Sequence, residues 1–171
     1  MRKGTVAAVL FCLAGPAAAI DIEPLARTCN NCHGVDGVSV GTTMPSIGGL
    51  PKDYLSRVMK EWKYDKRAAA TMNRIVKGLS DDEIDALAAH FAAKRWRPVA
   101  QKTAAAGLSK GRAAVRDNCA DCHGATGNDP DIGTPRLDGQ WADYMALELE
   151  KYRDPEFAMP HRKMNKAIRQ L

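Results

Sequence analysis

A five-residue motif occurs twice in the chain, and it constrains the fold more than any other feature. The segment Cys29-Asn30-Asn31-Cys32-His33 recurs as Cys119-Ala120-Asp121-Cys122-His123, at an offset of 90 residues. The same offset relates, without a gap, Pro45 to Pro135, Gly49 to Gly139, Tyr54 to Tyr144 and Trp62 to Tyr152. Ungapped similarity over this length indicates an internal duplication, so the sequence predicts two domains of one kind.

The spacing within the motif suits the attachment of a haem. Two cysteines three positions apart on a helix place their thiols one turn apart, which fits thioether bonds to the two vinyl groups of one haem. The adjacent histidine is then placed to bind the iron as its proximal ligand. The motifs therefore predict two covalent haem c groups, attached by Cys29 and Cys32 and by Cys119 and Cys122, with His33 and His123 as proximal iron ligands.

Three other uses of the cysteines compete with this interpretation. The two Cys-x-x-Cys pairs could share one zinc ion, but the gap between them is far longer than usual zinc-site spacings. A thioredoxin-like redox pair needs a βαβ context, which the helical pattern of this chain does not provide. A disulfide across a two-residue gap closes almost no loop and would stabilise the fold little.

Residues 1–19 have the three parts of a secretory signal: the basic Arg2 and Lys3, an apolar run over 5–13, and Ala17-Ala18-Ala19. We expect cleavage after Ala19, loss of Cys12 with the signal, and export to the periplasm. The mature chain would keep 152 residues and four cysteines, and its net charge would fall from +5 to +3.

Composition excludes two classes of function. A net charge of +3, without a basic run interleaved with aromatic residues, argues against nucleic-acid binding. No run of about 18 apolar residues is present, so we expect no membrane span.

Apolar residues recur at helical spacing and no strand alternation is present, so the predicted class is all-α. Helices are expected before each motif (22–29 and 108–119), and an amphipathic helix after each motif, carrying Leu55 to Trp62 and Tyr144 to Lys151. A capping box at Ser80 to Glu83 opens another helix. The predicted organisation is a signal (1–19), a first domain (20–94), a linker (95–107) and a second domain (108–171). Each domain is small enough that a haem should supply part of its core.

The sixth iron ligand decides what a haem protein does, because a bound thioether favours electron transfer and an open site favours ligand binding. Met59 and Met145 lie in the amphipathic helices and are interpreted as packing residues. Met72 lies in an irregular stretch between two helices, and Met164 has the same Met-Asn-basic context. We expect these two as distal ligands, with Met159 and His161 as alternatives for the second haem.

Pro45 and Pro135 each follow the proximal histidine by twelve residues. A carbonyl at this position can accept the imidazole Nδ1–H and hold the ring in one tautomer, as histidines that bind metals usually require. An ordinary turn proline is the alternative, and the equal spacing in both repeats favours the haem role.

The chain resembles the dihaem c-type cytochromes, in particular the cytochrome subunits of flavocytochrome c sulfide dehydrogenases and the related subclass-four cytochromes c. The residues that carry the resemblance are Cys32-His33-Gly34 through Gly41, Pro45-Ser46-Ile47, Met72 through Gly78, Trp96-Arg97-Pro98 through Gln101, and Gly139-Gln140-Trp141. The resemblance implies two tandem class I cytochrome c domains with His/Met ligation. It also implies a separate flavoprotein subunit that carries FAD and oxidises sulfide, and a redox partner such as a small cytochrome c.

In that interpretation the chain is an electron-transfer subunit with no catalytic residues of its own. The alternative is a diffusible dihaem shuttle that feeds a terminal oxidase. A third possibility, peroxidase-like chemistry, needs an open iron, and Met72 argues against it in the first domain.

The second domain departs from the family pattern at its end. A helix follows Met72 and reaches Ala93, whereas seven residues follow Met164. We therefore expect either a truncated sequence without the closing helix or a less buried second haem.

Overall fold

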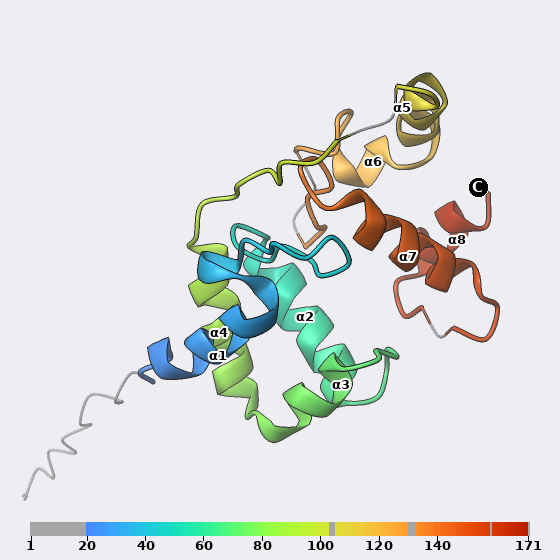
Figure 1. Ribbon diagram of the computed structural model, residues 1–171. Helices are drawn as coiled ribbons and strands as arrows, with labels where there is room; N and C mark the ends of the chain where they lie inside the picture. The colour runs from blue at the N-terminus through green and yellow to red at the C-terminus, as the bar shows by residue number, and fades with distance from the viewer. Residues whose placement is uncertain (1–19, 103–104, 130–132, 158, 171) are drawn as a thin grey trace, which may run out of the picture.

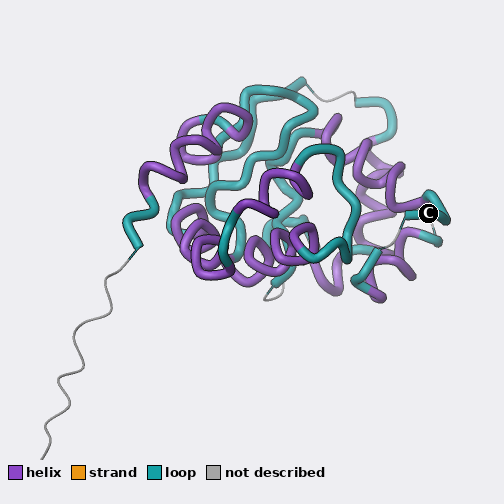
Figure 2. Tube along the Cα trace, turned by 90° about the horizontal axis from the view of Figure 1, so that it is seen from below, coloured by secondary structure: helices purple, strands orange, loops and turns teal. Residues whose placement is uncertain are grey.

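The structure is a computed structural model that describes residues 20–102, 105–129, 133–157 and 159–170. The predicted signal lies outside these ranges. Figure 2 shows helices and loops and, within the described residues, no strand, which confirms the all-α class. We refer to residues 20–94 as the first half and to residues 108–170 as the second half.

The helices of the first half are α1 (Glu23–His33), α2 (Lys52–Lys63), α3 (Met72–Ile75) and α4 (Asp81–Ala92), with 3-10 turns η1 (Val35–Gly37) and η2 (Val76–Gly78). The second half contains α5 (Leu108–Asn118), α6 (Ala120–His123), α7 (Ala142–Arg153) and α8 (Arg162–Ile168) (Figure 1). Helix α7 begins and ends 90 residues after α2, so the offset between the motifs is also the offset between structural elements.

Two local predictions need correction. The helix expected to end at Cys29 continues through the motif to His33, and the corresponding second segment is split into α5 and α6. Continuation through the motif holds Cys29 and Cys32 one helical turn apart. The stretch around Met72 is not irregular, because Met72 begins the short helix α3.

The first half has an apolar core of its own. Helix α2 packs along α4, and α1 contacts α4 near the amino terminus of the described chain. The buried cluster consists of Ala26, Leu50, Leu55, Leu87, Ala88 and Phe91. These residues come from α1, the loop before α2, α2 itself and α4, so the cluster joins all three long helices.

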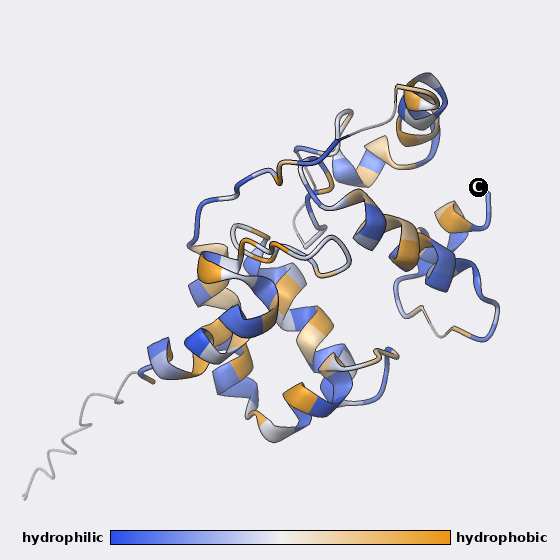
Figure 3. Cartoon of the chain, in the orientation of Figure 1, coloured by the Kyte–Doolittle hydropathy of each residue, from blue (hydrophilic) through white to orange (hydrophobic). Residues whose placement is uncertain are grey.

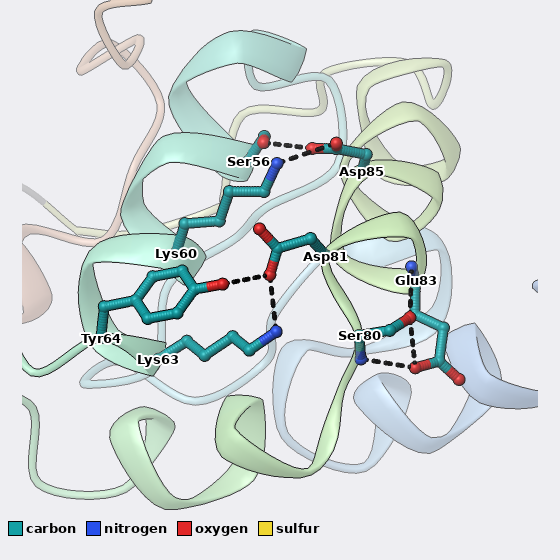
Figure 4. Close-up of polar contacts among 8 residues, drawn as sticks. All are labelled: Ser56, Lys60, Lys63, Tyr64, Ser80, Asp81, Glu83 and Asp85. Atoms are coloured by element: carbon teal, nitrogen blue, oxygen red, sulfur yellow. Dashed lines mark hydrogen bonds and ion pairs between the residues drawn. The ribbon is translucent and has the colours of Figure 1, made fainter.

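Polar contacts also join α2 to α4 (Figure 4). Lys60 Nζ lies 2.8 Å from an Asp85 carboxylate oxygen, and the Tyr64 hydroxyl donates to Asp81 over 2.8 Å. At the start of α4 the backbone N–H of Glu83 donates to Ser80 Oγ, and the backbone N–H of Ser80 donates to the Glu83 carboxylate. The predicted capping box is therefore present.

The second half has almost no apolar core. Of its described hydrophobic side chains, only Ile168 is buried. Leu147 and Leu149 of α7 are 51% and 38% exposed, and hydrophobic residues alternate with hydrophilic ones along α5 and α7 (Figure 3). Helices α5 to α8 therefore surround space that the protein's own side chains do not fill.

The described part of the predicted linker lies against the second half. The backbone N–H of Val99 donates to the Gly139 carbonyl over 2.9 Å, and Trp96 Nε1 donates to the Asp138 carbonyl over 3.1 Å. Gly49 and Gly139, which are 90 residues apart, both have positive φ, and a Cβ on either would lie within 3 Å of the linker residues Trp96 and Pro98. Glycine at these two positions lets the linker pass close to both halves.

Candidate functional site

The two motif histidines have the same hydrogen-bonding arrangement. His33, at the end of α1, lies with Nδ1 2.9 Å from the Pro45 carbonyl oxygen, and His123 lies with Nδ1 2.8 Å from that of Pro135. A carbonyl can only accept, so Nδ1 carries a proton in each ring, and in the neutral ring Nε2 keeps its lone pair. Nε2 is thus the nitrogen available to bind iron, and the two bonds predicted from the twelve-residue spacing are present.

Both imidazoles are buried, at 8% and 6% exposure. Burial lowers the pKa of His33 below its ordinary value, and the hydrogen bond to Pro45 opposes this effect in part. The result favours the neutral ring, which is the form that binds a metal ion.

The four motif cysteines are all free thiols. Burial raises the pKa of Cys29 and of Cys119, so both remain protonated near neutral pH. In the described part of the chain no three His, Cys, Asp or Glu side chains gather closely enough to hold a metal ion.

A cavity of about 2130 Å³ runs through both halves and is lined by all but one of the predicted site residues. These are Cys29, His33, Pro45 and Met72 from the first half and Cys119, Cys122, His123, Pro135 and Met164 from the second. Cys32 is not on the lining and is exposed. Met159 and His161 also line the cavity, as do Met59 and Met145, so the geometry does not separate the second-haem candidates.

The cavity fits two haems. Its volume exceeds the roughly 300–1,000 Å³ of a pocket for one small ligand. Leu55, Val58 and Phe91 give it an apolar wall. Trp62 Nε1, on the same lining, is buried and has no hydrogen-bond partner in the described protein. A haem propionate would supply the acceptor that this indole N–H lacks, since buried donors are rarely left unpaired.

Charged and phenolic groups line the cavity where the halves meet, and sequence reasoning missed most of them. Arg67 is 5% exposed, donates to the Glu61 carboxylate over 2.7 Å and approaches the Tyr152 hydroxyl at 3.4 Å. Burial is the main cause that raises the pKa of Tyr54 and of Tyr144, so both phenols stay neutral. The 90-residue pairing of the tyrosines was a signal for their position, whereas nothing in the sequence marked Arg67.

No family model matches the chain, but individual proteins do. Cytochrome c4 of Pseudomonas aeruginosa is 32% identical over 152 residues, which cover 82% of this chain and 73% of that protein. The chain belongs to the cytochrome c4 family. The crystal structure of reduced recombinant cytochrome c4 from Pseudomonas stutzeri matches with a TM-score of 0.77 and 25% identity, over 90% of each chain.

The names of two relatives of this cytochrome c4 family member refer to enzymes that oxidise sulfur compounds. The thiosulfate dehydrogenase electron acceptor of Stutzerimonas stutzeri is 29% identical over 81% of this chain and 72% of its own length. The cytochrome subunit of sulfide dehydrogenase of Chlorobaculum tepidum is 33% identical over 47% of this chain and 80% of its own length.

Family membership confirms the predictions of two tandem class I cytochrome c domains and of two covalent haem c groups. The protein is a dihaem electron carrier of the cytochrome c4 type. Among the described residues, no helix combines the length and apolarity that crossing a bilayer requires.

Proposed function

We propose that this cytochrome c4 family member is a periplasmic carrier that takes electrons from an enzyme oxidising an inorganic sulfur compound and delivers them to a second redox protein. The observation that carries the proposal is the repeated arrangement of the site. Each half presents a buried histidine held by a proline carbonyl, and a methionine, to one shared cavity.

Within this proposal the motif cysteines Cys29, Cys32, Cys119 and Cys122 attach the haems, and His33 and His123 bind the irons on one side. Met72 and Met164 bind them on the other. Residues 20–94 and 108–171 each hold one haem, residues 95–107 join them, and residues 1–19 direct export. All four proposed iron ligands and all of the attachment cysteines except Cys32 line the cavity, which supports this assignment.

A bound haem takes up and releases one electron at its iron, and the protein's residues set the conditions for that exchange. The Pro45 and Pro135 carbonyls fix the tautomer of the two proximal histidines. Leu55, Val58 and Phe91 keep water from the first site, which favours transfer with little reorganisation. Trp62, whose N–H has no hydrogen-bond partner among the described residues, would bind a propionate.

The breadth of the match favours a diffusible carrier. Similarity to cytochrome c4 extends over 82% of the chain, and the thiosulfate dehydrogenase electron acceptor matches over a similar share. The test is to mix the purified oxidised protein with a thiosulfate-oxidising enzyme and its substrate and to follow the haem spectrum. We expect a monomer on size-exclusion chromatography, whose haems are reduced only when enzyme and substrate are both present. Reduction by thiosulfate alone would contradict the carrier role.

A second candidate is the cytochrome subunit of a flavocytochrome c sulfide dehydrogenase. The supporting observation is the match to that subunit over 89 residues, 47% of this chain, at 33% identity. A flavin releases two electrons per turnover, and two haems would take one each. This candidate predicts co-purification with an FAD-containing chain and haem reduction by sulfide only in that complex. A protein that purifies without flavin and binds no flavoprotein would exclude it.

A further inference from the structure

The peptide that holds the first proximal histidine is itself held by a side chain from the other half. The carbonyl of Pro45 accepts the Nδ1–H of His33, and the N–H of the same peptide belongs to Ser46. That N–H donates to Oε1 of Gln140 over 3.0 Å, and Nε2 of Gln140 donates to the Ser46 carbonyl over 2.8 Å. Ser46 and Gln140 are 1% and 4% exposed, so water does not compete for these bonds.

The second site has no counterpart of this pair. Position 136, which corresponds to Ser46, is Arg136, and position 50, which corresponds to Gln140, is Leu50. Both halves therefore have the histidine–proline bond. A glutamine that bonds to the residue after the proline is present at the corresponding position for the first site and not for the second.

We infer that Gln140 is a positioning residue that tunes the first haem from the second half of the molecule. The bonds form a chain that runs from His33 through the Pro45–Ser46 peptide to Gln140. A peptide whose N–H is engaged has a more negative carbonyl oxygen, because hydrogen bonds in series polarise one another. A stronger acceptor at Nδ1 makes the imidazole a more electron-rich ligand, which stabilises ferric over ferrous iron. Gln140 thus lowers the potential of the first haem and leaves the second unaffected.

The inference rests on the proposed role of His33 as proximal ligand, and a redox titration of the intact dihaem protein tests it. Gln140→Leu removes both bonds to Ser46 at similar side-chain size. We expect the first-haem midpoint to rise, by about a threefold shift of the one-electron equilibrium toward the reduced state, or ~28 mV at 59 mV per tenfold. The second midpoint should not move. The midpoints are assigned to their haems by comparison with Met72→Ala.

Trp141→Phe is the matched control. Trp141 is the next residue and also bonds across the halves, since its Nε1 donates to the Ser39 carbonyl over 3.1 Å. Its backbone N–H donates to Gln140 Oε1 over 3.1 Å, and Trp141→Phe keeps that bond while removing the indole N–H. Loosening of the contact between the halves would affect both variants, whereas the proposed tuning affects only Gln140→Leu. Equal shifts in the two variants, or equal shifts of both haems in Gln140→Leu, would overturn the inference.

Gln140→Glu gives an independent test if Gln140→Leu does not fold. It keeps the oxygen that accepts from Ser46 N–H, so the first-haem midpoint should stay at the wild-type value or fall. A rise like that expected for leucine would overturn the inference. A wild-type protein that lacks a low-spin first haem would instead overturn the assignment of His33, and the inference with it.

Discussion

At the residue scale, replacing Met72, the expected sulfur ligand of the first haem, tests the site most directly. Met72 begins α3 and lines the cavity that His33 also lines. Met72→Ala should abolish the long-wavelength sulfur-to-iron charge-transfer band of one haem, which is about half of the total intensity, because the thioether bond is lost. Absorption spectroscopy of the oxidised protein measures this change.

Met59→Ala is the control for that variant, since Met59 lines the same cavity but packs from α2 against the buried cluster. It should keep the full band. An undiminished band in Met72→Ala would show that another residue binds the first iron.

Three residues compete for the second iron, and one of them already has a structural role. His161 Nδ1 accepts from the backbone N–H of Met164 over 3.3 Å, so His161 caps the start of α8. We expect Met164→Ala to abolish the charge-transfer band of the second haem. Met159→Ala and His161→Ala should each keep the bands of both haems. Loss of the band in Met159→Ala alone would transfer the ligand role to that residue.

The contacts that could be predicted from the sequence differ from those that could not in how far apart the two partners lie along the chain. The histidine–proline bonds were predictable because both partners lie in one repeat at a fixed twelve-residue spacing. Gln140 and Ser46 are 94 positions apart, and their contact depends on how the two halves pack, which no local pattern encodes. Arg67 was missed for the same reason, since its approach to Tyr152 also crosses between the halves.

At the scale of single elements, the capping box of α4 makes a measurable contribution. Ser80→Ala removes the side-chain acceptor for the Glu83 N–H and should destabilise the protein by about 1 kcal/mol, the usual cost of losing an N-cap hydroxyl. Chemical denaturation followed by helical circular dichroism measures the loss. Ser80→Thr keeps the hydroxyl and should lose clearly less. Equal losses in both variants would mean that the hydroxyl bond does not stabilise α4.

The same cap predicts a pH dependence. Hydrogen bonds from the backbone and side chain of Ser80 lower the pKa of Glu83. The resulting stabilisation is present above the ordinary glutamate pKa of about 4.3 and is lost as the pH falls through the lower value of the folded state. Denaturation midpoints of wild type and Glu83→Gln, which lacks the carboxylate charge, should therefore converge in acid, and a constant difference down to the lowest pH would contradict this origin.

The observed ends of the helices show where N-capping and hydrophobic periodicity were sufficient to predict a helix boundary. The helix at 81–92 follows from its cap and its apolar stripe, and the structure agrees. The helix at the first motif was predicted too short, because hydrophobic periodicity stops where Asn30 and Asn31 begin, although the backbone remains helical to His33. The cofactor chemistry of the motif, rather than its hydrophobicity, was the better guide to that boundary.

At the scale of the whole molecule, the two halves differ in how much of their stability comes from packing of the protein's own apolar side chains. The buried cluster of the first half joins three helices, whereas Ile168 is the one described hydrophobic residue of the second half that is buried. Burial of apolar area is the main force that holds helices together, so α5 and α7 depend on what fills the cavity between them.

This asymmetry predicts unequal responses to the loss of each haem. In Cys119→Ala/Cys122→Ala, without the second haem, the amide protons of α5 and α7 should exchange nearly as fast as in an unfolded chain, because few apolar contacts remain to oppose opening. In Cys29→Ala/Cys32→Ala, α2 and α4 should retain part of their protection, since Leu55, Leu87 and Phe91 still pack together. Hydrogen exchange of each variant, compared with the doubly loaded protein, measures the difference. Each variant serves as the control for the other, because both lose one haem and two thiols. Equal loss of protection in the two halves would mean that the first core is no more self-sufficient than the second.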